Sequence, residues 1–398
     1  MRDWIIVDEL VINQGETVIK IHDVVLKAYT EEGKFYLTRL NGTLGGDFEA
    51  VTVSAEGEMG LNVPHALQLS ATLNSSSELV GRGELVLKAG GELLNYQANL
   101  SGNWTYADFP AYALNARGRG SFEGVLLDTV SLAGDGGNVD LSGELQWSPF
   151  LKWNLQGVAE NIKPEYFDEA MKGVVNLTLT SSGNLEGEPE ASLQLAKLEG
   201  ELRGLPLKAE LEAEVKDNGL LLSKFEVLLG DNHLVASGEA NKGSAIDWRL
   251  NAPRLEQLHP DISGTLVGDG ALSGTVDGSV FQLAIDELNG QVMDYSVDAK
   301  GGLSLVDGLV TAKALQVNVG DNLLKMDGVA NEGQGIDWVL AGDDLSQLHP
   351  ELSGQLQGRG NAKGLLDGSK VALQIDALEG KVKDYPLMAE GFVRLEGQ

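Results

Sequence analysis

The chain contains nearly the same stretch of sequence twice, and this repetition constrains its fold more than any other feature. "LEQLHPDISGTL" begins at Leu255 and "LSQLHPELSGQL" begins at Leu345, a spacing of 90 residues. Shorter motifs recur at the same spacing, namely GDN from Gly230, IDW from Ile246 and DGS from Asp277. A fixed long period indicates tandem copies of one structural unit that stack against each other.

Within a copy, the hydrophobic residues follow a period of two. "FQLAI" begins at Phe281, "LQVNV" at Leu315 and "VALQI" at Val371, and each alternates apolar residues with polar or small ones. Such alternation is typical of antiparallel strands with one face in water, and the short Gly-Asp-Asn and Asp-Gly-Ser motifs between them favour hairpin turns. The sequence therefore predicts an all-β chain with five or six strands per copy. The "LHP" segments are expected to be loops or single helical turns.

The period predicts about four tandem copies of a roughly 90-residue unit, the last one truncated. The expected organisation is one continuous, elongated β groove over 1–398, made of divergent first strands at 1–65, a degenerate repeat at 66–163, repeats at 164–254 and 255–344, and a truncated repeat at 345–398. No signal peptide or long apolar run is evident, and both ends suggest a piece of a longer protein.

Composition excludes several classes of function. The formal net charge is -30, so the chain should repel phosphate backbones and no nucleic-acid partner is expected. Cysteine is absent, which rules out disulfides, thiolate metal sites and cysteine nucleophiles. We find no nucleotide-binding or nucleophile motif and no ligand cluster at metal spacing, so no enzyme activity, metal or cofactor is expected. His259 and His349 are interpreted as turn residues.

The apolar face of the strands needs a cover, because no long amphipathic helix is present in the sequence. A second sheet would give a string of sandwiches. Alternatively, the sheet curls into a trough that is filled by its own side chains or by an apolar ligand. The inward positions are rich in Leu, Ile, Val, Ala and Gly, which favours the trough, although glycines in strands also mark bulges and bends.

The repeated pattern resembles the periplasmic repeat region of the TamB, AsmA-like family. It is carried by Trp248, Leu250, Pro260, Ser263, Gly264, Gly268, Gly270, Gly274, Ile285, Leu288, Gly290, Val292 and Tyr295, and again by the residues 90 positions later. The resemblance implies a U-shaped hydrophobic groove, or β-taco, in the periplasm of a Gram-negative bacterium. It also implies an inner-membrane anchor that this chain lacks, and an outer-membrane barrel partner, TamA, which a part of the protein not seen here would contact.

The implied function is bridge-like transfer of glycerophospholipid from the inner to the outer membrane, with the acyl chains in the groove. The alternative is a scaffold or chaperone for outer-membrane protein and autotransporter assembly that uses strand edges. A third hypothesis is an extracellular repeat adhesin, but such a protein should show shorter periods and an exposed aromatic or Ca²⁺-binding signature, and neither is seen. The predicted groove residues are Leu193, Leu195, Phe225, Val227, Leu229, Leu234, Ile246, Trp248, Leu250, Ile262, Leu266, Phe281, Leu283, Ile285, Val292, Val297, Leu315, Val317, Val319, Leu324, Ile336, Trp338, Leu340, Leu352, Leu356, Val371, Leu373, Ile375, Val382 and Leu387.

Overall fold

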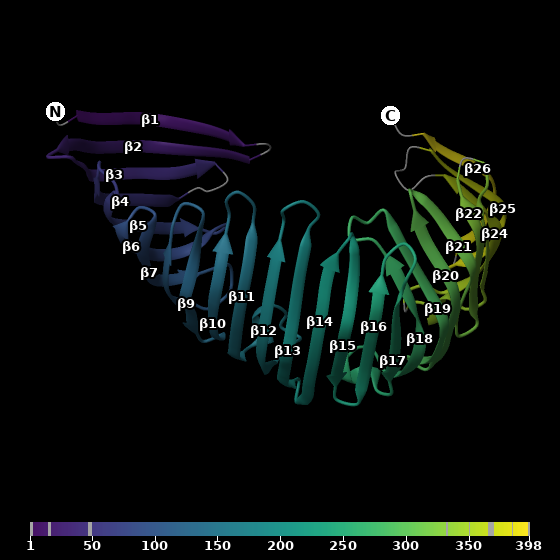
Figure 1. Ribbon diagram of the computed structural model, residues 1–398. Coiled ribbons are helices and arrows are strands. Elements are labelled where there is room, and N and C mark those ends of the chain that lie inside the picture. Colours follow the sequence, from purple (N-terminus) through teal and green to yellow (C-terminus); the bar gives the residue numbers. More distant parts are fainter. Residues whose placement is uncertain are drawn as a thin grey trace. The chain divides into compact units, whose positions relative to one another are not determined.

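The computed structural model describes residues 3–14, 17–46, 50–331, 333–349, 351–364, 370–383 and 385–396. These residues form strands joined by hairpin turns, with three short 3₁₀ turns (Figure 1). The expected all-β class is confirmed. No helix among them is long and apolar enough to cross a membrane.

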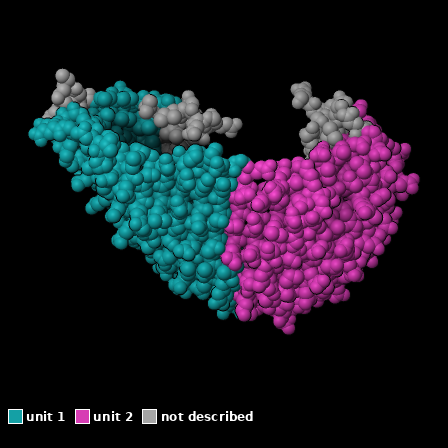
Figure 2. All heavy atoms as spheres, in the orientation of Figure 1, with its two compact units in different colours: residues 1–187, 195–204 teal, residues 188–194, 205–398 magenta. Residues whose placement is uncertain are grey.

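The chain divides into two compact units, which Figure 2 shows in different colours. Unit 1 contains residues 1–187 and 195–204, and unit 2 contains residues 188–194 and 205–398, so that strand β13 (Glu190–Leu202) is shared between them. The strands of unit 1 are β1 (Asp3–Gln14), β2 (Thr17–Glu31), β3 (Lys34–Gly46), β4 (Val51–Gly60), β5 (Ala66–Ser77), β6 (Gly81–Glu92), β7 (Asn95–Thr105), β8 (Tyr112–Gly120), β9 (Gly124–Gly134), β10 (Gly137–Gln146), β11 (Lys152–Ile162) and β12 (Gly173–Asn184). The 3₁₀ turn η1 (Pro164–Tyr166) precedes β12.

Unit 2 shows the 90-residue period in its secondary structure. Its strands are β14 (Leu205–Lys216), β15 (Gly219–Leu229), β16 (Asn232–Ala240), β17 (Ile246–Ala252), β18 (Gly264–Gly274), β19 (Val280–Val292), β20 (Tyr295–Val306), β21 (Leu309–Val319), β22 (Asn322–Ala330), β23 (Ile336–Gly342), β24 (Gly354–Gly364), β25 (Lys370–Val382) and β26 (Tyr385–Glu396). The turns η2 (Leu255–Gln257) and η3 (Leu345–Gln347) follow β17 and β23. Every element from β14 to β20 has a counterpart 90 residues later with matching bounds.

Within each unit, the described strands pair with their neighbours in the chain, and the registers of these pairs are antiparallel. In unit 1 the ladder runs from β1 to β12 without a crossover. In unit 2 it runs from β14 to β26 in the same way. Several of the connections are tight two-residue turns, in which Asp217 and Asn218 both have positive φ angles of 50° and 58°. Positive φ at both central residues is the signature of a type I′ hairpin turn.

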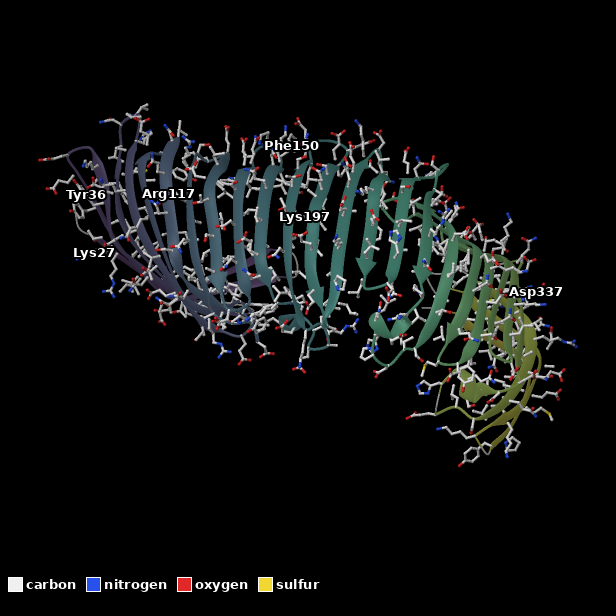
Figure 3. The ribbon with its side chains drawn as sticks, turned by 90° about the horizontal axis from the view of Figure 1, so that it is seen from below. Lys27, Tyr36, Arg117, Phe150, Lys197 and Asp337 are labelled. Atoms are coloured by element: carbon white, nitrogen blue, oxygen red, sulfur yellow. The ribbon has the colours of Figure 1, made fainter. Side chains whose placement is uncertain are left out.

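Strand β14 shows how the two faces arise. Leu207, Ala209 and Leu211 point to one face and are half-buried, whereas Lys208 and Glu210 point to the other face and are exposed. Successive side chains of a strand point to opposite faces, so the alternation in the sequence becomes an apolar and a polar face of the sheet. Figure 3 shows the side chains standing along the strands.

Bulges interrupt the ladder at equivalent places in the repeat. One extra residue in β19 shifts the register on both sides, at Asp269/Gly270 in the pairing with β18 and between Ile285 and Leu288 in the pairing with β20. Shifts at Arg359/Gly360 and Ile375/Leu378 repeat them 90 residues later. A bulge bends its strand and increases the local twist, so β19 and β25 are bent at the same point of the repeat.

The start of each repeat differs from the prediction. Ile262 and Leu352 were expected inside the first strand of a copy, but β18 begins at Gly264 and β24 at Gly354. The backbone N–H of Ile262 donates to the carbonyl of His259, and that of Leu352 donates to the carbonyl of His349. These turns hold both residues outside the ladder. A single 3₁₀ turn directly precedes each Leu-His-Pro triplet, so the connection contains one helical turn, as expected.

Candidate functional site

An uninterrupted row of apolar residues crosses each unit at right angles to its strands. Cross-strand partners lie on the same face of a sheet, so the printed registers define these rows. The central row of unit 2, from β14 to β26, is Ala209, Val227, Leu234, Leu250, Gly268, Leu288, Ala299, Val317, Leu324, Leu340, Gly358, Leu378 and Ala389. No polar residue interrupts it.

Unit 1 has a row of the same kind. The central row of unit 1, from β1 to β12, is Ile5, Leu26, Leu40, Ala55, Ala71, Leu87, Leu100, Ala116, Val130, Leu141, Gly157 and Leu179. The sequence analysis named none of these residues, because the 90-residue register is weak before residue 164. The period-two alternation alone, for example in "ALQLSATLN" from Ala66, was the signal that could have found them.

The apolar face is only half-covered. The leucines and valines of the two central rows are half-buried rather than buried. Among the described residues, no large side chain is fully buried, and the buried hydrophobic cluster around Leu222, Ala240 and Ile246 is small. The accessible surface of 23648 Å² compares with roughly 15,000 Å² for a compact monomer of this mass. The surface in excess of that of a compact monomer is expected for a sheet whose faces are not covered by another layer.

Tryptophans cover the glycines of the neighbouring strand on this face. Trp248 is opposite Gly270 in the ladder, and Trp338 is opposite Gly360. A Cβ atom on Gly270 would lie 2.8 Å from Cζ2 of Trp248, and one on Gly360 would lie 2.7 Å from Cζ2 of Trp338. Each indole ring therefore packs on backbone that has no side chain, and only glycine leaves room for it.

Most predicted groove residues of unit 2 lie on the apolar face. The registers place there Phe225, Val227, Leu229, Leu234, Ile246, Trp248, Leu250, Leu266, Phe281, Leu283, Ile285, Val292, Val297, Leu315, Val317, Val319, Leu324, Ile336, Trp338, Leu340, Leu356, Leu373, Ile375, Val382 and Leu387. Val371 of β25 pairs with Gly364 of β24, and its side chain is not among those that the structure describes. Leu193 and Leu195 lie in β13, while Ile262 and Leu352 lie outside the strands.

A buried Asn–Gln network explains the repeated "GDN" and "LEQLHP" motifs. In the second network, the side-chain amide of Asn322 donates to the carbonyls of Val319 (3.0 Å) and Asp344 (2.8 Å). Its side-chain oxygen accepts from the backbone N–H of Asp344 (3.2 Å). Gln347 Oε1 accepts from the backbone N–H of Asp321 (2.7 Å), and Gln347 Nε2 donates to the Asp321 carboxylate (2.8 Å). The β21–β22 turn is thereby tied to η3.

The first network makes the same bonds 90 residues earlier. Asn232 is 3% exposed and donates to the carbonyls of Leu229 (3.2 Å) and Arg254 (2.9 Å), while Gln257 accepts from the N–H of Asp231 (2.7 Å). The sequence analysis interpreted GDN as turn chemistry and did not identify the glutamines. Their recurrence in both "LHP" motifs was the available signal.

The histidines of the "LHP" motifs are turn residues, as predicted. His259 Nδ1 accepts from the backbone N–H of Asp261 at 3.3 Å, and His349 Nδ1 accepts from that of Glu351 at 3.2 Å. Among the described residues, no group of three potential metal ligands is close enough to hold an ion.

The chain is similar to known proteins over most of its length. The family model described as "TamB, N-terminal domain" matches residues 82–287 and 277–389. A relative from Haemophilus influenzae, the "Translocation and assembly module subunit TamB", is 24% identical over 323 residues. That alignment covers 78% of this chain but 25% of the relative, so the chain spans about a quarter of the relative's length. No solved structure matches.

Proposed function

This chain belongs to the TamB family, whose members are Gram-negative envelope proteins, and from that premise we propose that it is a segment of a lipid conduit. Acyl chains of glycerophospholipids lie along the apolar face of the sheet, and their head groups stay in water at its open margins. The observation that carries the proposal is the pair of central rows, which stay apolar from strand to strand and remain half-exposed.

An exposed apolar surface of this extent is unfavourable in water and favours a partner that covers it. Transfer of a methylene group from water to an apolar surface is worth about 0.8 kcal/mol, so a lipid tail would be held by many small, similar contacts. Contacts of equal strength along a row create no single deep minimum. A lipid can therefore move from one strand to the next at little cost in free energy.

The remaining parts of the proposal follow from family membership. We propose that the protein works in the periplasm between the two membranes, that other parts of it contact the inner membrane and TamA, and that it has no catalytic role. The relative's name describes it as a subunit of a translocation and assembly module. The 90-residue repeat suits such a role, because added copies lengthen the apolar face without changing its chemistry.

The test is lipid extraction and mass spectrometry on chain that has been purified without detergent. We expect glycerophospholipid to copurify with the native chain. Leu283→Asp with Leu373→Asp puts carboxylates on the apolar face and should remove the lipid. The matched control, Gln282→Asp with Gln374→Asp, places the same charges on the exposed polar face of the same strands and should retain it. Circular dichroism checks that all variants keep their strands. A native chain free of lipid would contradict the proposal.

A scaffold role is the second candidate, and the name of the Haemophilus influenzae relative, a subunit of a translocation and assembly module, favours it. In this role a strand edge of the sheet accepts a substrate strand by β-augmentation. This hypothesis predicts that substitutions at a strand edge impair substrate assembly, while charges on the apolar face do not.

A further inference from the structure

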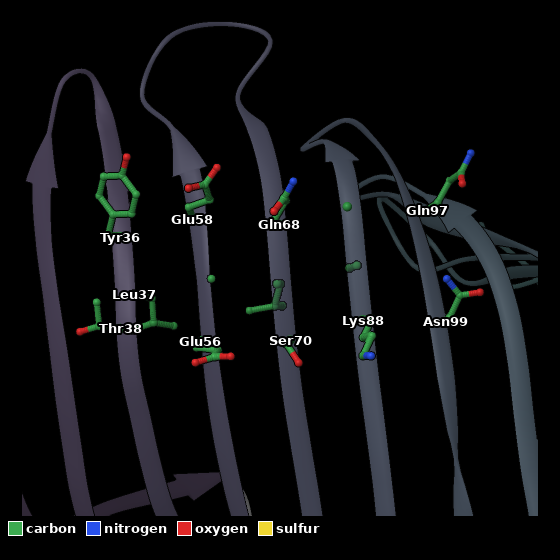
Figure 4. Close-up of a pocket in the computed structure, with 14 residues that line it drawn as sticks. Tyr36, Leu37, Thr38, Glu56, Glu58, Gln68, Ser70, Lys88, Gln97 and Asn99 are labelled. Carbon is green, nitrogen blue, oxygen red and sulfur yellow. The ribbon is translucent and has the colours of Figure 1, made fainter.

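The polar face of unit 1 contains a hollow that the lipid proposal does not use. It has a volume of about 770 Å³ and lies over β3 to β7, where its lining includes Tyr36, Glu58, Gln68, Lys88, Gly90 and Gln97 (Figure 4). Gly90 lies at the base of the hollow and has no side chain to fill it. A Cβ atom built there would meet one neighbouring atom, the carbonyl oxygen of Leu67, at an ordinary 3.6 Å.

Two of the strands under this hollow, β5 and β7, have no charged residue on the polar face, whereas β6 between them has Arg82, Glu84, Lys88 and Glu92 there. The outward residues of β5 are Ala66, Gln68, Ser70, Thr72, Asn74 and Ser76, and those of β7 are Asn95, Gln97, Asn99, Ser101, Asn103 and Thr105. None is charged, although the chain carries a net charge of -30. On β14 of unit 2, by contrast, the polar side of the strand carries Lys208, Glu210, Glu212, Glu214 and Lys216.

Two parallel rows of polar groups cross the hollow. Cross-strand pairing defines the first as Tyr36, Glu58, Gln68, Gly90 and Gln97, and the second as Glu56, Ser70, Lys88, Asn99 and Arg117. Figure 4 shows the labelled members side by side on consecutive strands. The side chains of Gln68, Ser70, Lys88 and Gln97 make no hydrogen bond to another residue that the structure describes, so their donors and acceptors are available.

An aromatic ring closes one end of the first row. Tyr36 stacks on Tyr29 of the neighbouring strand, with ring centroids 4.9 Å apart and an interplanar angle of 18°. At the other side of the hollow, Arg117 Nε donates to Asn99 Oδ1 at 3.2 Å, which fixes the amide that faces the second row. Figure 3 labels both Tyr36 and Arg117.

We propose that this hollow binds the glycan strand of the bacterial cell wall, a linear β-1,4-linked chain of N-acetylated sugars. Amide and hydroxyl side chains both donate and accept hydrogen bonds, as the acetamido and hydroxyl groups of such sugars do. One sugar of a β-1,4-linked chain is about as long as the spacing between neighbouring strands, roughly 4.8 Å. A glycan lying along the first row thus meets a new polar position at each successive sugar.

Charge also favours a glycan over the other polymers of the envelope. Within the hollow, Glu56 and Glu58 are balanced by Lys88 and by Lys34, whose Nζ lies 2.9 Å from Glu58 Oε1. A locally neutral surface offers little to an anionic membrane or a nucleic acid, which need clusters of like charge. The cell-wall glycan lies in the envelope compartment where TamB-family proteins work. This inference does not depend on lipid transport.

The experiment measures binding of a short β-1,4-linked N-acetylglucosamine oligomer by calorimetry, and of insoluble peptidoglycan by cosedimentation. The decisive variant is Gly90→Ile, which fills the floor of the hollow. Gly90 does not have a positive φ, and isoleucine favours strands, so the variant should be at least as stable as the native chain. The matched control is Gly302→Ile, a polar-face glycine of β20 with similarly open surroundings.

We expect the native chain and Gly302→Ile to bind both ligands, and Gly90→Ile to lose them. Gln68→Ala with Gln97→Ala removes hydrogen bonds without filling the hollow and should weaken oligomer binding by about tenfold. Equal binding by Gly90→Ile and the native chain would overturn the proposal. The same holds for a native chain that binds neither ligand at millimolar concentration, or that cosediments with phosphatidylglycerol vesicles through this hollow instead.

Discussion

Replacing Asn322 by alanine should loosen one copy of the repeat and leave its counterpart intact. The substitution removes two donated hydrogen bonds, to the carbonyls of Val319 and Asp344, and one accepted from the N–H of Asp344. Asn322 is 4% exposed, so the abandoned carbonyls are poorly placed to find water. At about 1 kcal/mol per bond, the free energy of local opening should fall by about 3 kcal/mol.

That loss corresponds to faster amide exchange by on the order of a hundredfold, because each 1.4 kcal/mol is roughly a factor of ten. Hydrogen–deuterium exchange with mass spectrometry measures it in peptides that span the β21–β22 turn and η3. The corresponding peptides over β15–β16 and η2 come from the same molecule and contain the first network. They are the internal control and should keep their protection.

A graded variant sharpens this test. Asn322→Asp keeps an oxygen that can accept from the N–H of Asp344 but loses both donated bonds, so it should fall between the native chain and Asn322→Ala. Unchanged exchange in Asn322→Ala would show that the buried amide does not hold the turn to η3. Equal loss of protection in both copies would show that the network stabilises the whole unit rather than one hairpin.

Two further predictions concern the turns. Gly320→Ala should lower the thermal unfolding midpoint more than Gly308→Ala, because both glycines have positive φ but only at Gly320 would a Cβ meet the Gln347 side chain. The backbone costs about 1 kcal/mol in both variants, and the displaced hydrogen bond costs about 1 kcal/mol more in Gly320→Ala. Equal midpoints would contradict the assigned role of Gln347. The Thr275 hydroxyl and the Ser279 backbone N–H hold the pKa of Asp277 well below its usual range. The carboxylate therefore stabilises the β18–β19 turn above about pH 4, and this stabilisation should disappear as the pH falls further. The difference in melting temperature between the native chain and Asp277→Asn measures it, and a difference that grows on acidification would contradict this pH dependence.

The strands and their faces were predictable because alternation needs only neighbouring residues. Leu283 follows the polar Gln282 and Ile285 precedes the polar Asp286, and the ladder places both apolar side chains on the apolar face. The bend in β19 was harder to predict. The apolar spacing changes from two to three between Ile285 and Leu288, where β19 has its bulge, but one irregular step is easily taken for noise.

Features that join distant residues were not predictable from local pattern. Asn232 and Gln257 are far apart in the sequence, and the burial that makes them structural depends on η2 folding back onto the hairpin turn. Ile262 continued the alternation of β18 on paper, but the His259 turn keeps it out of the ladder. The proposed copy boundaries at residues 66, 164, 255 and 345 remain predictions.

Pairing between chain neighbours alone has a consequence for how each unit reaches its native state. Within the described ladders each strand pairs with the strand before it, across a hairpin turn or a connection with one 3₁₀ turn, so the strand pairing is local in sequence. A strand that emerges late can add to an edge that is already complete, much as monomers add to the end of a growing filament. Such a sheet can assemble progressively from its first hairpin while later strands are still unfolded, and the growing edge then pairs with each new strand in turn.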